Sequence, residues 1–377
     1  MKNIQMVDLK SQYQKIKPAI DQAINEVIES AQFINGPEVK GFQSDLESYL
    51  GVNHVIPCAN GTDALQISLM ALGLKPGDEV ITPSFTFIAT TEVIALLGLK
   101  PVFVDVDKDT MCIDATKIEA AITDKTKAIV PVHLYGQAAE MEAIIKVAHK
   151  HKLFVVEDNA QAIGSNFHCV DGMQKTGTLG DIGCTSFFPS KNLGCYGDGG
   201  AIFTNNDELA AKMRMIVNHG QSKRYYHDVV GVNSRLDSVQ AAVLRIKLRE
   251  LDNYIAARRK VADHYDNFFA KYDGVKTPVR GEHSKHVFHQ YTLTLEGIDR
   301  DALNAFLATK NVPSMIYYPV PAHKQEMFSA FDSASTELPV TDWLCERVLS
   351  LPIHTEMEDE QLEYICSSIA EFLDAKS

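Results

Sequence analysis

Three groups of residues in this chain have the chemistry of a single cofactor site: an amine, a carboxylate and an anion-binding turn. Lys191 lies between an apolar run (184–188) and a glycine-rich turn (197–200), Asp158 ends the apolar run 153–158, and Asn60-Gly-Thr-Asp63 follows an earlier apolar run. Pyridoxal phosphate (PLP) requires an amine for its aldehyde, an acid beside its pyridine nitrogen and an anion site for its phosphate. Lys191 by itself also fits a solvated loop lysine. The order of its partners along the chain favours the PLP site.

The predicted phosphate site lies where a strand turns into a helix, within residues 54–65. Gly61 and Thr62 offer free N–H groups, a hydroxyl and the positive end of the helix dipole. Asn, Thr and Asp also cap helices for purely structural reasons, so this motif alone does not indicate a phosphate site. The presence of Lys191 is what supports that interpretation. Ser186, five residues before the lysine, is a further candidate ligand from the neighbouring strand.

Three side chains are candidates for contacts with the cofactor ring. A carboxylate at Asp158 would stabilise the protonated pyridine nitrogen, and the charged ring then accepts the electrons left by deprotonation of a substrate carbon. A turn residue at a strand end is the alternative for Asp158. Phe87 could stack on the ring or belong to the core. Gln161, three residues after Asp158, could contact the ring oxygen.

The elements that must position these residues alternate between strand and helix. Apolar runs rich in β-formers are separated, through the first five, by helical stretches such as 62–73, 87–98 and 140–151. This pattern predicts an α/β fold with a mainly parallel, seven-stranded sheet and helices on both faces. Ligands of such sheets bind at the carboxyl ends of the strands, where the three groups lie. The predicted strands are 54–59, 79–84, 101–106, 127–134, 153–158, 184–188 and 200–205.

The second half of the chain has a different pattern. A helix (207–218) and the basic and aromatic segment 219–227 precede a long predicted helix from about 236 to 270. The remainder reads as α+β with a proline-containing loop region. We therefore expect a large α/β domain over residues 1–250, which includes an N-terminal helix, and a smaller α+β domain over 251–377.

Composition narrows the possible partners. The chain has 377 residues, 45% of them apolar, and a formal net charge of −13 without a long basic run. Nucleic acid and anionic membranes are therefore poor candidate partners. Neither a signal peptide nor an apolar stretch of about 18 residues is visible, which indicates the cytoplasm. Seven scattered cysteines without a C-x-x-C pair indicate reduced thiols, with no disulfide or zinc site.

A histidine cluster around His286 and His289 raises the question of a metal site. Residues 286–295 read as a strand, in which these two side chains point to opposite faces. This geometry is unsuitable for joint ligation, and we expect no metal site.

Motifs along nearly the whole chain resemble those of the DegT/DnrJ/EryC1/StrS sugar aminotransferases. They are Gly36-Pro-Glu-Val39, Asn60-Gly-Thr-Asp-Ala-Leu65, Thr82-Pro-Ser-Phe-Thr-Phe87, Pro131-Val-His-Leu-Tyr-Gly136, Val156-Glu-Asp-Asn-Ala-Gln-Ala162, Ser186-Phe-Phe-Pro-Ser-Lys-Asn-Leu193, Gly197-Asp-Gly-Gly-Ala201 and Asn233-Ser-Arg-Leu-Asp237. The resemblance implies fold-type I, PLP as cofactor, a homodimer with shared active sites, and a nucleotide-linked keto-sugar as amino acceptor. It also implies an amino acid donor, commonly L-glutamate.

The resemblance assigns roles residue by residue. Lys191 is the lysine that forms the Schiff base with PLP, and Asp158 pairs with the pyridinium. Gly61, Thr62 and Ser186 are phosphate ligands, while Asn233 would reach the phosphate of the other subunit's cofactor. Relatives that dehydrate sugars carry His in place of this lysine, so Lys191 implies transamination. It would anchor the cofactor and then move the proton as a free amine.

The motifs are most similar to the branch that aminates C3 of UDP-2-acetamido-3-keto-glucuronate, an activity of surface polysaccharide biosynthesis. Arg224 and Tyr225 could recognise the diphosphate and the sugar acid, although 219–227 also fits an ordinary surface loop. Arg235 is another candidate cation. The family places the loop 317–323 near the sugar, which makes Tyr318 and His323 candidate substrate ligands. A surface histidine is the alternative for His323.

Other functions remain open at this point. Enzymes acting on dTDP-3-keto-6-deoxyhexoses share most of these motifs. A PLP lyase or desulfurase could use the same lysine and aspartate with Cys195 as nucleophile, but Cys195 has no base nearby in sequence. A cofactor-free regulatory protein would keep the sheet motifs and would be colourless when purified.

Overall fold

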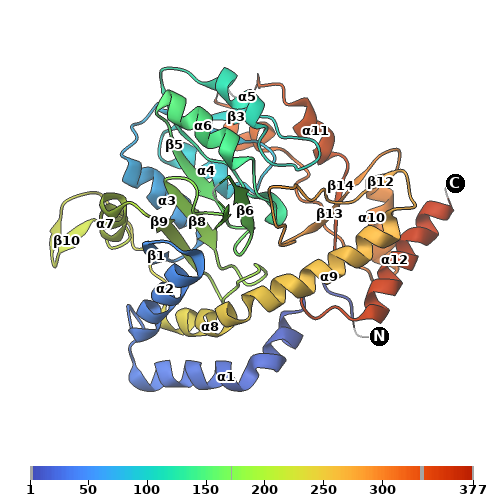
Figure 1. The fold of residues 1–377 in the computed structure, drawn as a ribbon, viewed down its shortest axis with the longest axis horizontal. Helices are drawn as coiled ribbons and strands as arrows, with labels where there is room; N and C mark the ends of the chain where they lie inside the picture. Colours follow the sequence, from blue (N-terminus) through green and yellow to red (C-terminus); the bar gives the residue numbers. More distant parts are fainter. Residues whose placement is uncertain (1–2, 171, 332–334, 376–377) are drawn as a thin grey trace.

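The computed structural model describes residues 3–170, 172–331 and 335–375, and a seven-stranded sheet forms its centre (Figure 1). The strand order is β1-β9-β8-β5-β4-β2-β3. Strand β9 is antiparallel to both of its neighbours, whereas the other neighbouring pairs are parallel. The prediction of a mainly parallel α/β sheet is confirmed. The strands are β1 (His54–Cys58), β2 (Glu79–Pro83), β3 (Lys100–Val104), β4 (Thr126–Ile129), β5 (Phe154–Asp158), β8 (Ile182–Ser186) and β9 (Gly200–Thr204).

Helices cover both faces of this sheet, because its strands are apolar on both sides. Apolar residues of α3, α4 and α7 pack on one face, and those of α6 and of the later helix α11 pack on the other. A further cluster joins β1 and β9 to α2 and α8. The bounds are α2 (Pro37–Leu50), α3 (Gly61–Leu72), α4 (Ala89–Leu96), α6 (Met141–His151), α7 (Asp207–Ile216), α8 (Ser238–Arg249) and α11 (Pro339–Cys345).

The predicted long helix is two helices in the structure. Helix α8 ends at Arg249, and α9 (Leu251–Phe269) continues after Glu250 toward the C-terminal part of the molecule (Figure 1). There α9 packs with α12 (Asp359–Asp374) and α10 (Arg300–Thr309) on an antiparallel sheet. The strands of this sheet are β12 (Val275–Lys276), β13 (Tyr291–Leu295) and β14 (Val348–Leu351).

Part of the region beyond residue 250 packs on the large sheet. The carboxylate of Asp105, directly after β3, accepts hydrogen bonds from the N–H groups of Val340 (3.0 Å) and Thr341 (2.8 Å) at the start of α11. Phe103 of β3 contacts Phe328, with ring centroids 5.4 Å apart. A later segment of the chain, around α11, therefore lies against the large sheet, and the domain boundary at residue 250 stays a prediction.

The histidine segment differs from its prediction. Strand β13 begins at Tyr291, so His286 and His289 precede it. His286 is buried and stacks on Phe288, with ring centroids 4.0 Å apart. Phe288 has a positive φ of 48°, which interrupts an extended backbone, and the strand argument for this pair was therefore wrong.

The remaining elements are short, apart from the N-terminal helix α1, which packs against α8. The β10–β11 hairpin projects from the molecule at the left edge of Figure 1. No helix in the described part of the chain is long and apolar enough to cross a membrane. The bounds are α1 (Leu9–Ser30), α5 (Ala115–Ile118), β6 (Asn166–Cys169), β7 (Gly172–Lys175), β10 (Gln221–Lys223) and β11 (Tyr226–His227), with 3-10 turns at η1 (Glu119–Ala121), η2 (Leu134–Gly136), η3 (Ala322–Lys324) and η4 (Glu326–Phe328).

Candidate active site

Lys191 lies in the loop that leaves β8 at its carboxyl end and leads into β9. The loop is fixed from two sides. The side-chain amide of Asn192 donates to the carbonyl of Val287 (3.0 Å), and the buried ammonium of Lys247 donates to the carbonyl of Gly194 (2.6 Å). The backbone around Lys191 is therefore held by contacts with distant parts of the chain.

The environment of the Lys191 amine favours its neutral form. Burial lowers the pKa of Lys191 to about 8, although the nearby charge of Asp158 acts in the opposite direction. Among the residues that the structure describes, none forms a hydrogen bond or an ion pair with its Nζ. A neutral amine is the form that attacks a carbonyl carbon, so this environment suits Schiff-base chemistry.

This pKa predicts how PLP recombines with the apoprotein. Only the neutral amine reacts, so the rate of covalent recombination should rise with pH and level off above about 8. A lysine with the reference pKa of about 10.4 would keep gaining rate for two further pH units. Stopped-flow absorbance between pH 6 and pH 10 measures this profile. A rate that still rises steeply above pH 9 would contradict the desolvated amine.

Asp158 ends β5 at the same edge of the sheet and is 5% exposed. Its Oδ1 accepts a hydrogen bond from the N–H of Ala160 (3.0 Å), and its Oδ2 accepts one from Thr90 Oγ1 (2.7 Å). Its backbone N–H donates to the carbonyl of Pro131 (2.9 Å). The carboxylate therefore has a fixed orientation next to Lys191.

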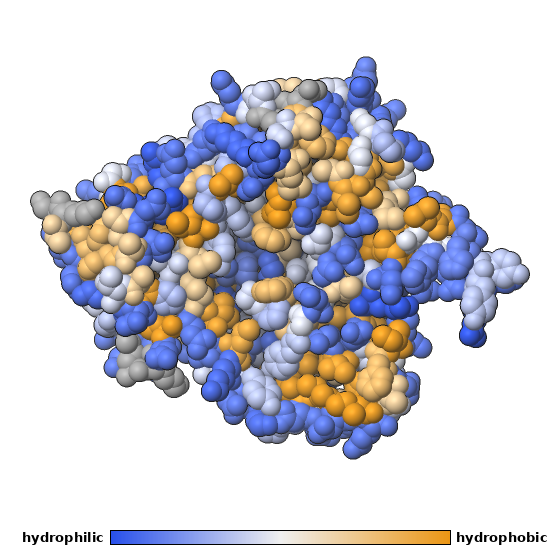
Figure 2. Space-filling view, turned by 180° about the vertical axis from the view of Figure 1, so that it is seen from behind, coloured by the Kyte–Doolittle hydropathy of each residue, from blue (hydrophilic) through white to orange (hydrophobic). Residues whose placement is uncertain are grey.

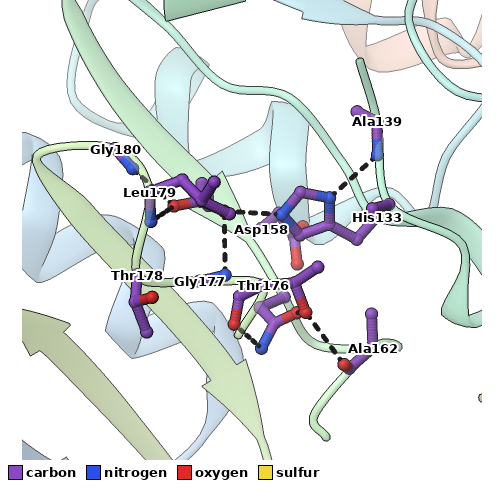
Figure 3. Close-up of polar contacts among 12 residues, drawn as sticks. His133, Ala139, Asp158, Ala162, Thr176, Gly177, Thr178, Leu179 and Gly180 are labelled. Atoms are coloured by element: carbon purple, nitrogen blue, oxygen red, sulfur yellow. Dashed lines mark hydrogen bonds and ion pairs between the residues drawn. The ribbon is translucent and has the colours of Figure 1, made fainter. Parts of the chain in front are cut away.

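Glu157, the buried acid that precedes Asp158, holds the end of β5 in place through hydrogen bonds in the region of Figure 3. Glu157 is fully buried, and its Oε2 lies 2.8 Å from Nε2 of His133. Because Nδ1 of His133 accepts a hydrogen bond from the N–H of Ala139 (3.1 Å), Nε2 carries the ring proton and donates a hydrogen bond to Glu157. The carboxylate also accepts from the N–H groups of Gly177 (2.8 Å), Leu179 (2.7 Å) and Gly180 (2.6 Å). Sequence reasoning did not single out either side chain.

Gln161 and the predicted substrate ligand Tyr318 lie together. The Nε2 of Gln161 donates to the hydroxyl of Tyr318 (3.1 Å), and its Oε1 accepts from the N–H of Tyr135 (3.0 Å). The ring of Tyr318 lies 6.2 Å from that of Phe87, which is 53% exposed just before α4. Burial raises the pKa of Tyr318, so its hydroxyl keeps its proton. Phe87 thus offers a free ring face in the same area.

The start of α3 forms a cradle beside β8. A Cβ on Gly61 would lie 2.6 Å from the Cβ of Ser186, so only glycine permits this approach. The side chain of Asn60 accepts from the N–H of Asp63 (2.8 Å), and the earlier N–H groups of Gly61 and Thr62 have no carbonyl partner within the helix. An anion that binds here would meet these donors and the hydroxyls of Thr62 and Ser186.

The structure does not bring every predicted residue to this area within one chain. Arg224 and Tyr225 are exposed at the tip of the β10–β11 hairpin, where the guanidinium lies 5.2 Å from the tyrosine ring centroid. Arg235 is half-buried and donates to Asn218 (3.4 Å), and Asn233 is exposed. Their hydrogen bonds and ring contacts do not include Lys191 or Asp158.

His323 requires a correction, because its side chain is fully buried. Its Nδ1 lies 2.7 Å from Ser84 Oγ, which also accepts a hydrogen bond from the backbone N–H of His323 (3.0 Å), and the ring packs near Phe103. Burial lowers the pKa of His323 and favours its neutral form. His323 thus anchors the 317–323 loop to Ser84, and its buried, neutral ring does not present a positive charge to a substrate.

Comparisons with known proteins agree with this geometry. A pleiotropic regulatory protein of Geobacillus stearothermophilus is 48% identical, with 98% of each chain covered. A UDP-2-acetamido-2-deoxy-3-oxo-D-glucuronate aminotransferase of Pseudomonas aeruginosa is 47% identical over 97% of this chain and 99% of that protein. A UDP-N-acetyl-3-dehydro-alpha-D-glucosamine 3-aminotransferase of Acidithiobacillus ferrooxidans is 45% identical over 97% of each chain.

Solved structures show the same architecture. A DegT DnrJ EryC1 StrS aminotransferase from Brucella abortus superposes with a TM-score of 0.93 at 42% identity, covering 98% of this chain and 99% of that one. A Bacillus subtilis protein with bound cofactor PMP gives 0.89 at 32% identity, covering 98% and 83% of the two chains. The fold is fold-type I, and the protein is a PLP-dependent sugar aminotransferase. A family model for DegT/DnrJ/EryC1/StrS aminotransferases matches residues 14–370, and the chain belongs to this family.

Proposed function

We propose that the protein transfers the amino group of an amino acid, L-glutamate, to C3 of a UDP-linked 2-acetamido-3-keto-glucuronate. The observation that carries this proposal is the desolvated Lys191 amine beside Asp158, at the sheet edge that also presents the α3 cradle. The 47% identity to the Pseudomonas aeruginosa enzyme supports the substrate. A cytoplasmic step in the synthesis of a surface polysaccharide such as lipopolysaccharide fits these reactants.

The residues present fit PLP, which supplies a ring that accepts electrons from the substrate carbon when it is bound. Lys191 would hold the aldehyde of this group and, as a free amine, would take the proton from the donor's Cα and pass it on as general base and then general acid. A pKa of about 8 leaves part of the lysine population neutral near pH 7, as this task requires. Asp158 would keep the pyridine nitrogen protonated, and Phe87 and Gln161 would hold the ring from its face and edge.

The phosphate would bind at the start of α3, with Gly61, Thr62 and Ser186 as ligands. We further propose a homodimer in which Asn233 completes this site in the second subunit. Exposed apolar side chains support a subunit interface next to the 233–238 segment: Phe33 is 45% exposed, and its carbonyl accepts from the N–H of Ser238 (2.9 Å). Figure 2 shows apolar surface at the lower right, the side on which α1 and α8 lie.

The nucleotide sugar would contact Tyr318, which lies beside the cofactor site. It would also contact Arg224 of the β10–β11 hairpin and Arg235 of the 233–238 segment. Arg224 and Tyr225 suit the diphosphate and the base, because a guanidinium binds paired oxygens and a ring offers a stacking face. Arg235, whose side chain is less exposed than that of Arg224, is our candidate for binding the sugar carboxylate. A homodimer would bring these exposed residues to the active site of the second subunit.

One of the relatives supports a second candidate for the sugar that accepts the amino group. The Acidithiobacillus ferrooxidans relative, at 45% identity, is named for a neutral 3-keto-glucosamine, which lacks the carboxylate. A dTDP-3-keto-6-deoxyhexose is a more distant alternative. Incubation of the purified protein with each UDP or dTDP keto-sugar and L-glutamate, followed by measurement of 2-oxoglutarate release, distinguishes these acceptors. A regulatory protein without activity would release none and would be colourless.

Substrate charge gives a quantitative prediction. We expect kcat/KM for the UDP-linked 3-keto-glucuronate to exceed that for the matching 3-keto-glucosamine sugar by about 100-fold, because the neutral sugar leaves a site cation without its partner. The Arg235→Gln variant should lose most of this preference by losing rate on the uronate alone. Steady-state kinetics with both sugars measure the ratio. Equal efficiency of the wild type on both sugars would reject the uronate and leave the aminotransferase assignment intact.

A further inference from the structure

The carboxylate of Asp158 accepts a hydrogen bond from the buried hydroxyl of Thr90, which contacts a second buried hydroxyl, that of Thr86. The chemistry described above uses neither hydroxyl. We propose that Thr90 is a positioning residue that orients the carboxylate of Asp158, and that Thr86 in turn orients the hydroxyl of Thr90. The inference rests on the proposed role of Asp158 beside the pyridine nitrogen. It adds a hydrogen-bonded relay, Thr86 to Thr90 to Asp158, to the residues of that site.

All three residues of the relay are withdrawn from solvent. Thr90 is 1% exposed, Thr86 is 4% exposed and Asp158 is 5% exposed. Thr90 Oγ1 lies 2.7 Å from Asp158 Oδ2 and 3.2 Å from Thr86 Oγ1. Burial excludes competing water from these hydroxyls, so each hydrogen bond is worth more here than on the surface.

The direction of each hydrogen bond follows from the chemistry of the groups. An ionised carboxylate only accepts, so Thr90 donates its single proton to Asp158. The hydroxyl of Thr90 can then only accept a hydrogen bond from the hydroxyl of Thr86. This assigns the donor in a contact whose geometry would allow either hydroxyl to donate. A hydroxyl that accepts one hydrogen bond becomes a stronger donor in the next, so Thr86 strengthens the bond from Thr90 to the carboxylate.

The relay leaves the carboxylate with one donor on each oxygen. The N–H of Ala160 donates to Oδ1 and the hydroxyl of Thr90 donates to Oδ2, which together fix the plane of the carboxylate. Thr90 lies in the first turn of α4, directly after the segment with Phe87. The same stretch of chain therefore presents a ring for stacking and a hydroxyl for the acid.

The chain offers a matched control one residue away. Thr91 is also fully buried on α4, but its hydroxyl donates to the carbonyl of Ile88 (3.0 Å) and not to Asp158. Thr90→Val and Thr91→Val each remove one buried hydroxyl and keep a β-branched side chain of the same shape. Thr90→Ser retains the donor, and Thr86→Val removes only the second hydroxyl.

We expect Thr90→Val to lower kcat about tenfold with a KM for L-glutamate within about twofold of wild type, and to weaken PLP binding to the apoprotein by about threefold to tenfold. Thr86→Val should lose less, while Thr90→Ser and Thr91→Val should stay within about twofold of wild type. PLP affinity is read by fluorescence titration of the apoprotein. Thermal unfolding of each apoprotein tests whether the three valine variants are folded.

A double-mutant cycle separates this inference from the role of Asp158. In an Asp158→Asn background, Thr90→Val should cost less than about a further twofold, because the charge on which it acts is gone. Equal losses in Thr90→Val and Thr91→Val, or a full tenfold loss in the Asp158→Asn background, would overturn the relay. Normal turnover in Asp158→Asn alone would instead overturn the role of Asp158. If Thr90→Val does not fold, wild-type PLP affinity and turnover in Thr86→Val would reject the relay.

Discussion

Replacing Lys191 with alanine is expected to remove the covalent attachment of PLP and to lower kcat by about 10⁴-fold, the upper range for loss of a positioned acid–base group. The variant loses both the amine that holds the aldehyde and the group that moves the proton. Borohydride reduction followed by intact mass measurement detects the attachment. Wild-type protein should gain the mass of one reduced cofactor per chain, and Lys191→Ala should gain none.

Lys247 provides the control for this experiment. Burial also lowers the pKa of this second lysine to about 8, and its side chain is 1% exposed. It is therefore a second candidate for attachment of PLP, although its Nζ donates a hydrogen bond to the carbonyl of Gly194 (2.6 Å). Lys247→Met should still trap PLP. Trapping in Lys191→Ala, with the cofactor mapped to another lysine, would refute the assignment of the anchor.

Replacing Asp158 with asparagine is expected to lower kcat by about 10³-fold while PLP affinity falls by less than tenfold. The substitution keeps the shape but removes the charge that stabilises a protonated pyridine nitrogen. A fixed charge in a water-excluded site matters most when electrons move into the ring, so turnover suffers more than binding. Single-turnover absorbance changes with L-glutamate and PLP titration of the apoprotein measure the two effects separately.

Asp105→Asn is a matched control for this variant. Asp105 is also a buried carboxylate directly after a strand of the sheet, 3% exposed, but it bonds the N–H groups of Val340 and Thr341. Its substitution should lower the thermal unfolding midpoint and leave the turnover of folded protein within about twofold. Near-normal turnover in Asp158→Asn would remove Asp158 from the mechanism.

The sequence was sufficient for the sheet and for the positions of its main polar residues. Each strand is a short apolar run that ends at a turn residue, and this local pattern survives folding because both faces of a parallel sheet are buried. Lys191, Asp158 and the turn at Gly61 were predicted at the carboxyl edge from their places after such runs. Shared strand direction then brings them to one edge, although they lie far apart in the chain.

Contacts between distant side chains were decided only by the tertiary structure. His323 contacts Ser84 across 239 positions, Thr90 contacts Asp158 across 68, and Glu157 contacts His133 across 24. The burial of His323 follows from the return of the chain to the large sheet, which hydrophobic periodicity does not encode. Periodicity shows which face of an element is apolar, but the partner of a buried polar group depends on how whole elements pack. The sequence therefore determined the elements and the reactive groups of this protein, whereas packing decided which hydroxyls, amides and acids hold those groups in place.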